Sequence, residues 1–246
     1  MTYCLGIVTK DGVVMASDSR TNAGSDQASV CRKMFRFEKA GDRALILLTS
    51  GGLSLSQSVV ALVESEFAKG EGLANVNTMY EAARIIGDHV RKVREIDRDC
   101  LEKDGIQFNV HFLLGGQIGD EPPQLYMIYP QGNPLRAAEE SPYLQIGEAK
   151  YGRPILDRGV KYNKTSLEEA AKYALISLDS TMRSNLTVGP PIDLVIYRKG
   201  DLKITQYRKF SENDPHLLAT RKMWEQSLRK AVQELPVISF EDSETN

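Results

Sequence analysis

The sequence predicts an α+β fold in which two antiparallel β-sheets lie between two layers of helices. Short strand-like runs cluster at the start of the chain, two long amphipathic helical segments follow them, and strands and helices then alternate. Runs of strands followed by runs of helices are typical of α+β domains rather than doubly wound α/β domains. No linker rich in Pro, Gly or Ser divides the 246 residues, so we expect a single domain over 1–246.

The strand assignments rest on short runs of apolar and β-branched residues. Residues 3–8 and 13–17 flank Asp11-Gly12, a pair that is typical of tight hairpins. A polar loop is expected over 18–24, and strands at 34–37 and 44–49 complete a group of four that we expect in one antiparallel sheet. Later strands are expected at 109–115, 124–129, 192–198 and 202–207.

The helix assignments rest on apolar residues at helical spacing over 53–69, 77–101, 167–183 and about 215–235. Thr78 and Glu81 have the spacing of a capping box at the start of the second of these helices. Pro236 ends the last helix, and we expect a disordered tail at 241–246.

Composition excludes several classes of function. The net charge of −2 comes from 31 basic and 33 acidic residues. This balance does not indicate electrostatic binding to nucleic acid or to a membrane surface. No signal peptide or membrane-spanning run is expected, and three cysteines in a chain of this length favour a reducing cytoplasm over a disulfide framework. We expect no metal, because His89, His111 and His216 are isolated and lack metal-ligand spacing. We expect no cofactor, because the glycine-rich run 115–119 lies between strands rather than at the start of a helix.

The first candidate for chemistry is Thr2. Removal of Met1 would leave Thr2 with a free α-amino group, whose ordinary pKa is about 7.7–8.0. Such an amine can take the proton of the threonine hydroxyl near neutral pH, as in nucleophiles paired with a built-in base. Many proteins begin with Met-Thr, so this observation acquires weight only from its neighbours.

Three further residues fit the same chemistry. The predicted hairpin returns Asp18 to the side of the terminus, and Lys33 at the start of the next strand could pair with it. A lysine near Thr2 would lower the pKa of both the hydroxyl and the amine. Gly51 lies where a strand runs into a helix, so its backbone N–H could stabilise an oxyanion. The alternative for Asp18 and Lys33 is that they are solvated surface charges, and the alternative for Gly51 is a simple turn. Cys4 lies on the same face as Thr2 and is either a second conceivable nucleophile or a packed core residue.

The chain resembles the β-type subunits of proteasomes, and within that superfamily the bacterial proteasome homologue Anbu, the ancestral β-subunit. The resemblance covers residues 2–208 and rests on five motifs. They are Thr2-Tyr3-Cys4-Leu5-Gly6, the run 16–24 (ASDSRTNAG), Arg32-Lys33-Met34-Phe35, Thr49-Ser50-Gly51-Gly52 and the run 187–194 (TVGPPIDL). It implies the four-layer αββα fold of N-terminal-nucleophile hydrolases.

The resemblance implies a role for each matching residue. Thr2 is the nucleophile, Asp18 and Lys33 are the characteristic charged pair, and Gly51 supplies the oxyanion amide, while Thr21 and Thr49 line the first substrate pocket. Two segments depart from the family pattern. Glu148 replaces a serine near the threonine amine, and Ser184 and Thr187 stand where an Arg-Asp-x-x-Ser element is usual, without its carboxylate.

The activity implied is that of a threonine endopeptidase which cleaves peptides or unfolded proteins inside a ring or helical homo-oligomer. The sequence indicates neither an ATPase partner nor the number of subunits. Two alternatives stay open because of Glu148 and the run 183–187. One is an N-terminal-nucleophile hydrolase for a small amide, and the other is an assembly scaffold that has lost activity.

Overall fold

The computed structural model describes residues 2–23 and 27–239, and its two large sheets are five-stranded and antiparallel. The first sheet has, in spatial order, β10 (Tyr143–Gly147), β1 (Tyr3–Thr9), β2 (Gly12–Asp18), β11 (Ile192–Arg198) and β12 (Gln206–Phe210). The second has β5 (Met34–Lys39), β6 (Arg43–Gly51), β7 (Val110–Ile118), β8 (Gln124–Ile128) and β9 (Pro134–Arg136).

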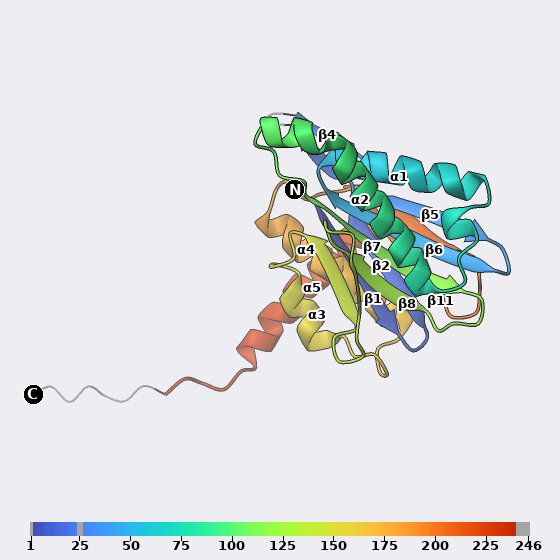
Figure 1. The fold of residues 1–246 in the computed structure, drawn as a ribbon. Coiled ribbons are helices and arrows are strands. Elements are labelled where there is room, and N and C mark those ends of the chain that lie inside the picture. Colours follow the sequence, from blue (N-terminus) through green and yellow to red (C-terminus); the bar gives the residue numbers. More distant parts are fainter. Residues whose placement is uncertain (1, 24–26, 240–246) are drawn as a thin grey trace, which may run out of the picture. The chain divides into compact units, whose positions relative to one another are not determined.

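Helices cover the outer face of each sheet. Helices α1 (Leu53–Ala68) and α2 (Met79–Lys103), with the short 3-10 turn η1 (Gly72–Ala74), pack on the second sheet, while α3 (Arg153–Gly159) and α4 (Leu167–Ser184) lie on the first (Figure 1). The predicted αββα order is therefore confirmed. The capping box of Thr78 and Glu81 is present at the start of α2. In the described part of the chain, no helix has both the length and the apolar character needed to cross a bilayer.

The core between the two sheets is built around Met15. This side chain is fully buried on β2 and lies over two glycines, Gly6 on the neighbouring strand β1 and Gly115 on β7 of the facing sheet. A Cβ at either glycine would come within 2.7 Å of the Met15 sulfur. The missing side chains thus make the space that lets the two sheets pack closely at this point.

The strands of the first half are distributed differently from the prediction. The four early strands do not form one sheet, because β1 and β2 join the first sheet and β5 and β6 join the second. The expected loop at 18–24 holds β3 (Arg20–Ala23), which pairs with β4 (Gln27–Val30). These pairings depend on distant partners: β2, for example, pairs with β11, which follows it by more than 170 residues.

Other elements were missed or shifted. The sequence analysis did not predict β9, β10 or α3, which are short, and the last strand begins at Gln206 rather than at residue 202. By contrast, β11 has the predicted bounds, and α1, α2 and α4 agree with the predicted helices to within two residues at each end. Long periodic segments were thus predicted well, and short edge elements were not.

Contacts divide the chain into two compact units, with the division between Glu212 and Asn213. The second unit contains α5 (Pro215–Gln233), whose first turn is capped by the Asp214 carboxylate through the N–H groups of His216 and Leu217. The helix predicted at about 215–235 is present, and the tail at 241–246 lies outside the described residues. A single peptidase domain over 1–246 stays a prediction.

Met15→Ala should lower the free energy of unfolding by about 2–5 kcal/mol, because it leaves a cavity between the sheets. Gly115→Ala should cost about 1–3 kcal/mol by overpacking the same space. The double variant should lose less than the sum of the two, since the new methyl group enters the vacated volume. Urea titrations of the three variants measure this coupling, and strictly additive losses would show that Met15 does not fill the space over Gly115.

Candidate active site

A buried ion pair joins the two sheets at the end of the sandwich where β1 begins. Lys33 Nζ, just before β5, lies 2.7 Å from Asp18 Oδ1 at the end of β2, and the two side chains are 6% and 0% exposed. Lys33 Nζ also donates a hydrogen bond to the Arg20 carbonyl oxygen at 2.6 Å. Burial raises the pKa of the Asp18 carboxyl, and the Lys33 ammonium acts in the opposite direction. A buried charge pair of this kind is favourable only when its remaining polar groups are hydrogen-bonded.

Two backbone N–H groups complete the surroundings of Asp18. Tyr3 N donates to Asp18 Oδ1 at 3.1 Å, and Gly189 N donates to Oδ2 at 3.2 Å. Because Tyr3 directly follows Thr2, the carboxylate that holds Lys33 also fixes the backbone next to the candidate nucleophile. The structure therefore brings Thr2, Asp18 and Lys33 together, as the sequence predicts.

Gly51 ends β6 at the edge of the same region. Its φ of +106° lies in the range that favours glycine, and a Cβ there would overlap the Asn109 carbonyl oxygen. Gly51 and Thr2 both line a cleft of about 490 Å³. The full lining is Thr2, Thr21, Ser50, Gly51, Leu53, Asn109, His111 and Gly147.

The two residues predicted for the substrate pocket have different positions. Thr21 and Ser50 line the cleft, whereas Thr49 is not among its lining residues, although Thr49 and Ser50 are equally buried at 6% exposure. Successive side chains of a strand point to opposite faces, so a shift of one position exchanges the two. The sequence analysis also missed His111, which contributes an imidazole to the cleft and stacks edge-on against Tyr129 with ring centres 6.2 Å apart. Burial lowers the pKa of His111.

The segment after α4 forms a hydrogen-bonded group with Glu148. Asn185 Nδ2 donates to Glu148 Oε2 at 3.0 Å, and Asn185 Oδ1 accepts from both the N–H and the hydroxyl of Thr187. Ser184, predicted beside Thr187, is exposed at the end of α4. The sequence predicts no role for Asn185, although this residue lies within the segment 183–187 that departs from the family pattern.

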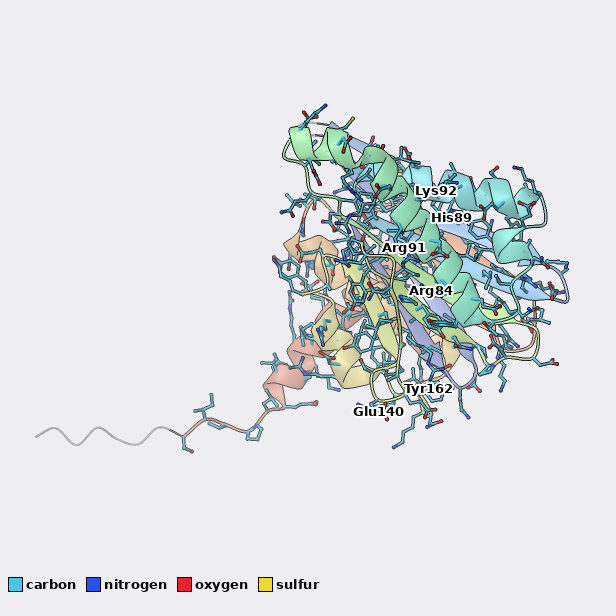
Figure 2. All side chains as sticks on the ribbon, viewed as in Figure 1. Arg84, His89, Arg91, Lys92, Glu140 and Tyr162 are labelled. Atoms are coloured by element: carbon cyan, nitrogen blue, oxygen red, sulfur yellow. The ribbon has the colours of Figure 1, made fainter. Side chains whose placement is uncertain are left out.

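Packing accounts for the alternative nucleophile Cys4, and an ion pair accounts for His89. Cys4 is fully buried, its thiol donates a weak hydrogen bond to the Thr49 carbonyl oxygen at 3.6 Å, and burial raises its pKa, which disfavours the reactive thiolate. His89 lies on α2 (Figure 2), and its Nε2 is 2.9 Å from Glu66 Oε2. Within the described residues no group of three His, Cys, Asp or Glu side chains could hold a metal ion.

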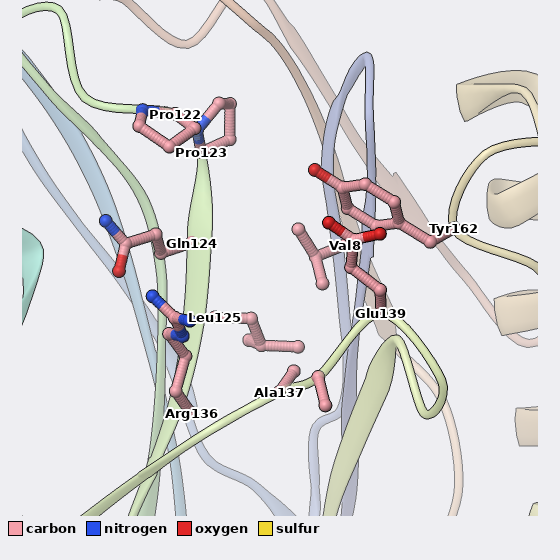
Figure 3. A pocket seen from close by; sticks show the side chains of 10 residues that line it. Val8, Pro122, Pro123, Gln124, Leu125, Arg136, Ala137, Glu139 and Tyr162 are labelled. Carbon is pink, nitrogen blue, oxygen red and sulfur yellow. The ribbon is translucent and has the colours of Figure 1, made fainter.

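A second cavity of about 170 Å³ lies near Val8, at the opposite end of β1 from Thr2 (Figure 3). Its lining includes Leu125 and Tyr162, and its charged groups, Arg136 and Glu139, are exposed side chains. It contains none of the residues predicted for catalysis or the substrate pocket. The candidate active site is therefore the cleft at Thr2.

Asp18→Asn should lower the free energy of unfolding by about 3–5 kcal/mol, because it leaves the Lys33 ammonium buried without its counter-charge. Combining it with Lys33→Met should recover part of this loss, since the double variant buries no charge at this position. Urea titration of both single variants and the double variant gives the coupling energy. A double variant as unstable as the sum of the singles would show that the two charges do not interact.

The chain is similar to known proteins over most of its length. A model of the proteasome subunit family matches residues 2–197. The proteasome subunit beta of Haloquadratum walsbyi is 27% identical over 214 residues, which cover 86% of this chain and 79% of that protein. The corresponding subunit of Archaeoglobus fulgidus is 28% identical over 198 residues, covering 79% and 84%.

Solved structures are similar over nearly the whole chain. Anbu, the ancestral beta-subunit, from Yersinia bercovieri is 42% identical with a TM-score of 0.90, covering 97% of this chain and 100% of that one. An Anbu mutant from Hyphomicrobium sp. strain MC1 is 40% identical with a TM-score of 0.91, covering 98% and 100%. A helical assembly of the Anbu complex from Pseudomonas aeruginosa is 41% identical with a TM-score of 0.90, covering 96% and 98%. The chain therefore belongs to the proteasome subunit family, and within that family it groups with Anbu.

Proposed function

We propose that the chain is a threonine-type endopeptidase whose nucleophile is the hydroxyl of Thr2 after removal of Met1. The observation that carries the proposal is the buried pair of Asp18 and Lys33, whose carboxylate also holds the N–H of the residue after Thr2. Buried ionisable groups whose pKa is shifted, as that of Asp18 is, are typical of functional sites. The cleft beside this pair also contains Gly51, whose backbone is suited to an oxyanion.

The proposed reaction has two halves. The Thr2 hydroxyl attacks the carbonyl carbon of a peptide bond, the α-amine of Thr2 accepts the hydroxyl proton, and the backbone N–H of Gly51 stabilises the oxyanion. The C–N bond then breaks, and the proton passes to the leaving amine. Water attacks the resulting acyl-threonine ester, which releases the second product and restores the hydroxyl. Throughout, the Lys33 charge favours the alkoxide by lowering the pKa of the hydroxyl.

Assembly and location form part of the same proposal. One similar protein, from Pseudomonas aeruginosa, was solved as a helical assembly of the Anbu complex. Identical subunits joined head to tail make a ring if the rotation closes and a helix if it does not. We propose such a homo-oligomer for this chain, with peptides or unfolded proteins as substrates. The three cysteines are free, which fits the proposed cytoplasmic location.

A covalent probe tests the nucleophile. Intact mass of the purified protein should show that Met1 is absent, and a β-lactone or epoxyketone should add one equivalent to Thr2. Thr2→Ser should keep labelling, because it retains a hydroxyl and a small N-terminal residue, while Thr2→Ala should abolish it. Retention of Met1, or labelling that persists in Thr2→Ala, would contradict the proposal.

The alternatives are separated by substrates. A panel of fluorogenic peptides tested beside small amides should show turnover of the peptides that depends on Thr2. Turnover of the small amides alone would favour an N-terminal-nucleophile amidohydrolase. No turnover, with assembly unchanged in Thr2→Ala as judged by native mass spectrometry, would favour a scaffold.

A further inference from the structure

Glu148 lies directly across from Thr2. Strand β10 pairs with β1 so that Gly147 is opposite Tyr3, and one residue further the Glu148 N–H donates to the Thr2 carbonyl oxygen at 2.8 Å. Gly147 has a φ of +85°, and a Cβ there would overlap the same carbonyl oxygen, so only glycine allows this approach. Side chains that lie opposite each other on antiparallel strands have Cβ atoms about 5 Å apart. Thr2 and Glu148 continue this pairing one residue beyond the two strands, so a glutamate side chain at 148 is long enough to bring its carboxylate to the main-chain nitrogen of Thr2.

The carboxylate is held in place from the other side. Glu148 is 9% exposed, and its Oε2 accepts from Asn185 Nδ2. The amide of Asn185 cannot turn round without loss, because its Oδ1 already accepts from the N–H of Thr187 at 3.0 Å and from its hydroxyl at 2.5 Å. The amide N–H₂ group therefore faces Glu148. Within the described residues, Glu148 also forms an ion pair with Lys150, whose Nζ lies 3.6 Å from Oε1 and whose side chain is 68% exposed.

We propose that the Glu148 carboxylate is the ion-pair partner of the Thr2 α-ammonium group, with Asn185 as the residue that positions it. The inference rests on the proposed function, since the amine exists only once Met1 is removed. A carboxylate at this place raises the pKa of the amine, so that it holds the proton taken from the hydroxyl more strongly. The family pattern has a carboxylate at position 184, where this chain has a serine. Glu148 therefore supplies a negative charge that Ser184 does not.

The other charged groups around Thr2 do not replace it. Asp18 is already compensated by Lys33 at 2.7 Å, and that lysine lowers the pKa of a nearby amine. His111 shares the cleft but can add only positive charge. In the described part of the chain, the titratable groups on the segments around Thr2 include Asp18 on β2, Lys33 before β5, His111 on β7, Glu148 and Lys150 after β10, and Arg183 on α4.

The test uses the full chain with Thr2 at its terminus, obtained by cleaving an N-terminal fusion so that it does not depend on maturation. Competition labelling with acetic anhydride across pH, read by mass spectrometry of the N-terminal peptide, gives the pKa of the Thr2 amine. Glu148→Gln, which keeps the shape and removes the charge, should lower this pKa by about one unit. Lys150→Gln should raise it slightly, and Glu139→Gln, an exposed control away from the site, should leave it unchanged.

The positioning role of Asn185 has a separate readout. Asn185→Leu should shift the amine pKa in the same direction as Glu148→Gln but by less, because the carboxylate stays and only its support is lost. If the protein reacts with the covalent probe, the acid limb of the rate–pH profile should move with the amine pKa, about tenfold in rate per unit below both values.

The outcomes distinguish the two proposals. An amine pKa that is the same in the wild type and in Glu148→Gln overturns the ion pair, even if the probe labels Thr2. A lowered amine pKa without any probe labelling keeps the ion pair and overturns the peptidase. Opposite shifts for Glu148→Gln and Lys150→Gln are the expected signature, since a structural disturbance alone would not change sign with the charge that is removed.

Discussion

The site depends on the ion pair between Asp18 and Lys33. Its two atoms, 2.7 Å apart, come from different sheets, so the pair forms only when the sandwich is assembled. The same carboxylate accepts the N–H groups of Tyr3 and Gly189, which ties the start of β1 to the loop before β11. A buried charge is costly unless every partner is present, so this arrangement selects one relative position of the sheets at this end of the molecule. Thr2 is held there as a consequence.

Glycines make the approach of the surrounding segments possible. Gly51 and Gly147 both have positive φ, and at each a side chain would overlap a carbonyl oxygen of the neighbouring strand. One brings a backbone amide to the edge of the cleft, and the other brings Glu148 opposite Thr2. In the interior, Gly6 and Gly115 make room for Met15 between the sheets. Glycine, which has no side chain, therefore permits close contacts both in the core and at the site.

The two departures from the family pattern, at Glu148 and in the segment 183–187, are in contact through Asn185. Position 148 has a carboxylate where the family pattern has a serine, and position 184 has a serine where the pattern has a carboxylate. The carboxylate is oriented by Asn185, and Asn185 is oriented by Thr187. A network in which each member satisfies the next is rigid, and truncating one member affects all of them. Asn185 and Thr187 of the segment 183–187 thus belong to one hydrogen-bonded group with Glu148.

The sequence by itself determined the long elements and predicted which residues carry the chemistry. Helices α1, α2 and α4 and strand β11 follow from periodicity, and Thr2, Asp18, Lys33 and Gly51 were named from hairpin geometry and residue chemistry. It did not determine which sheet each early strand joins, because β2 and β11 pair across most of the chain and such pairings leave no local pattern. It also placed Thr49 rather than Ser50 on the cleft and missed His111 and Asn185. Only the tertiary structure decided these positions, because the face of a strand that meets a cleft depends on what packs against its other side.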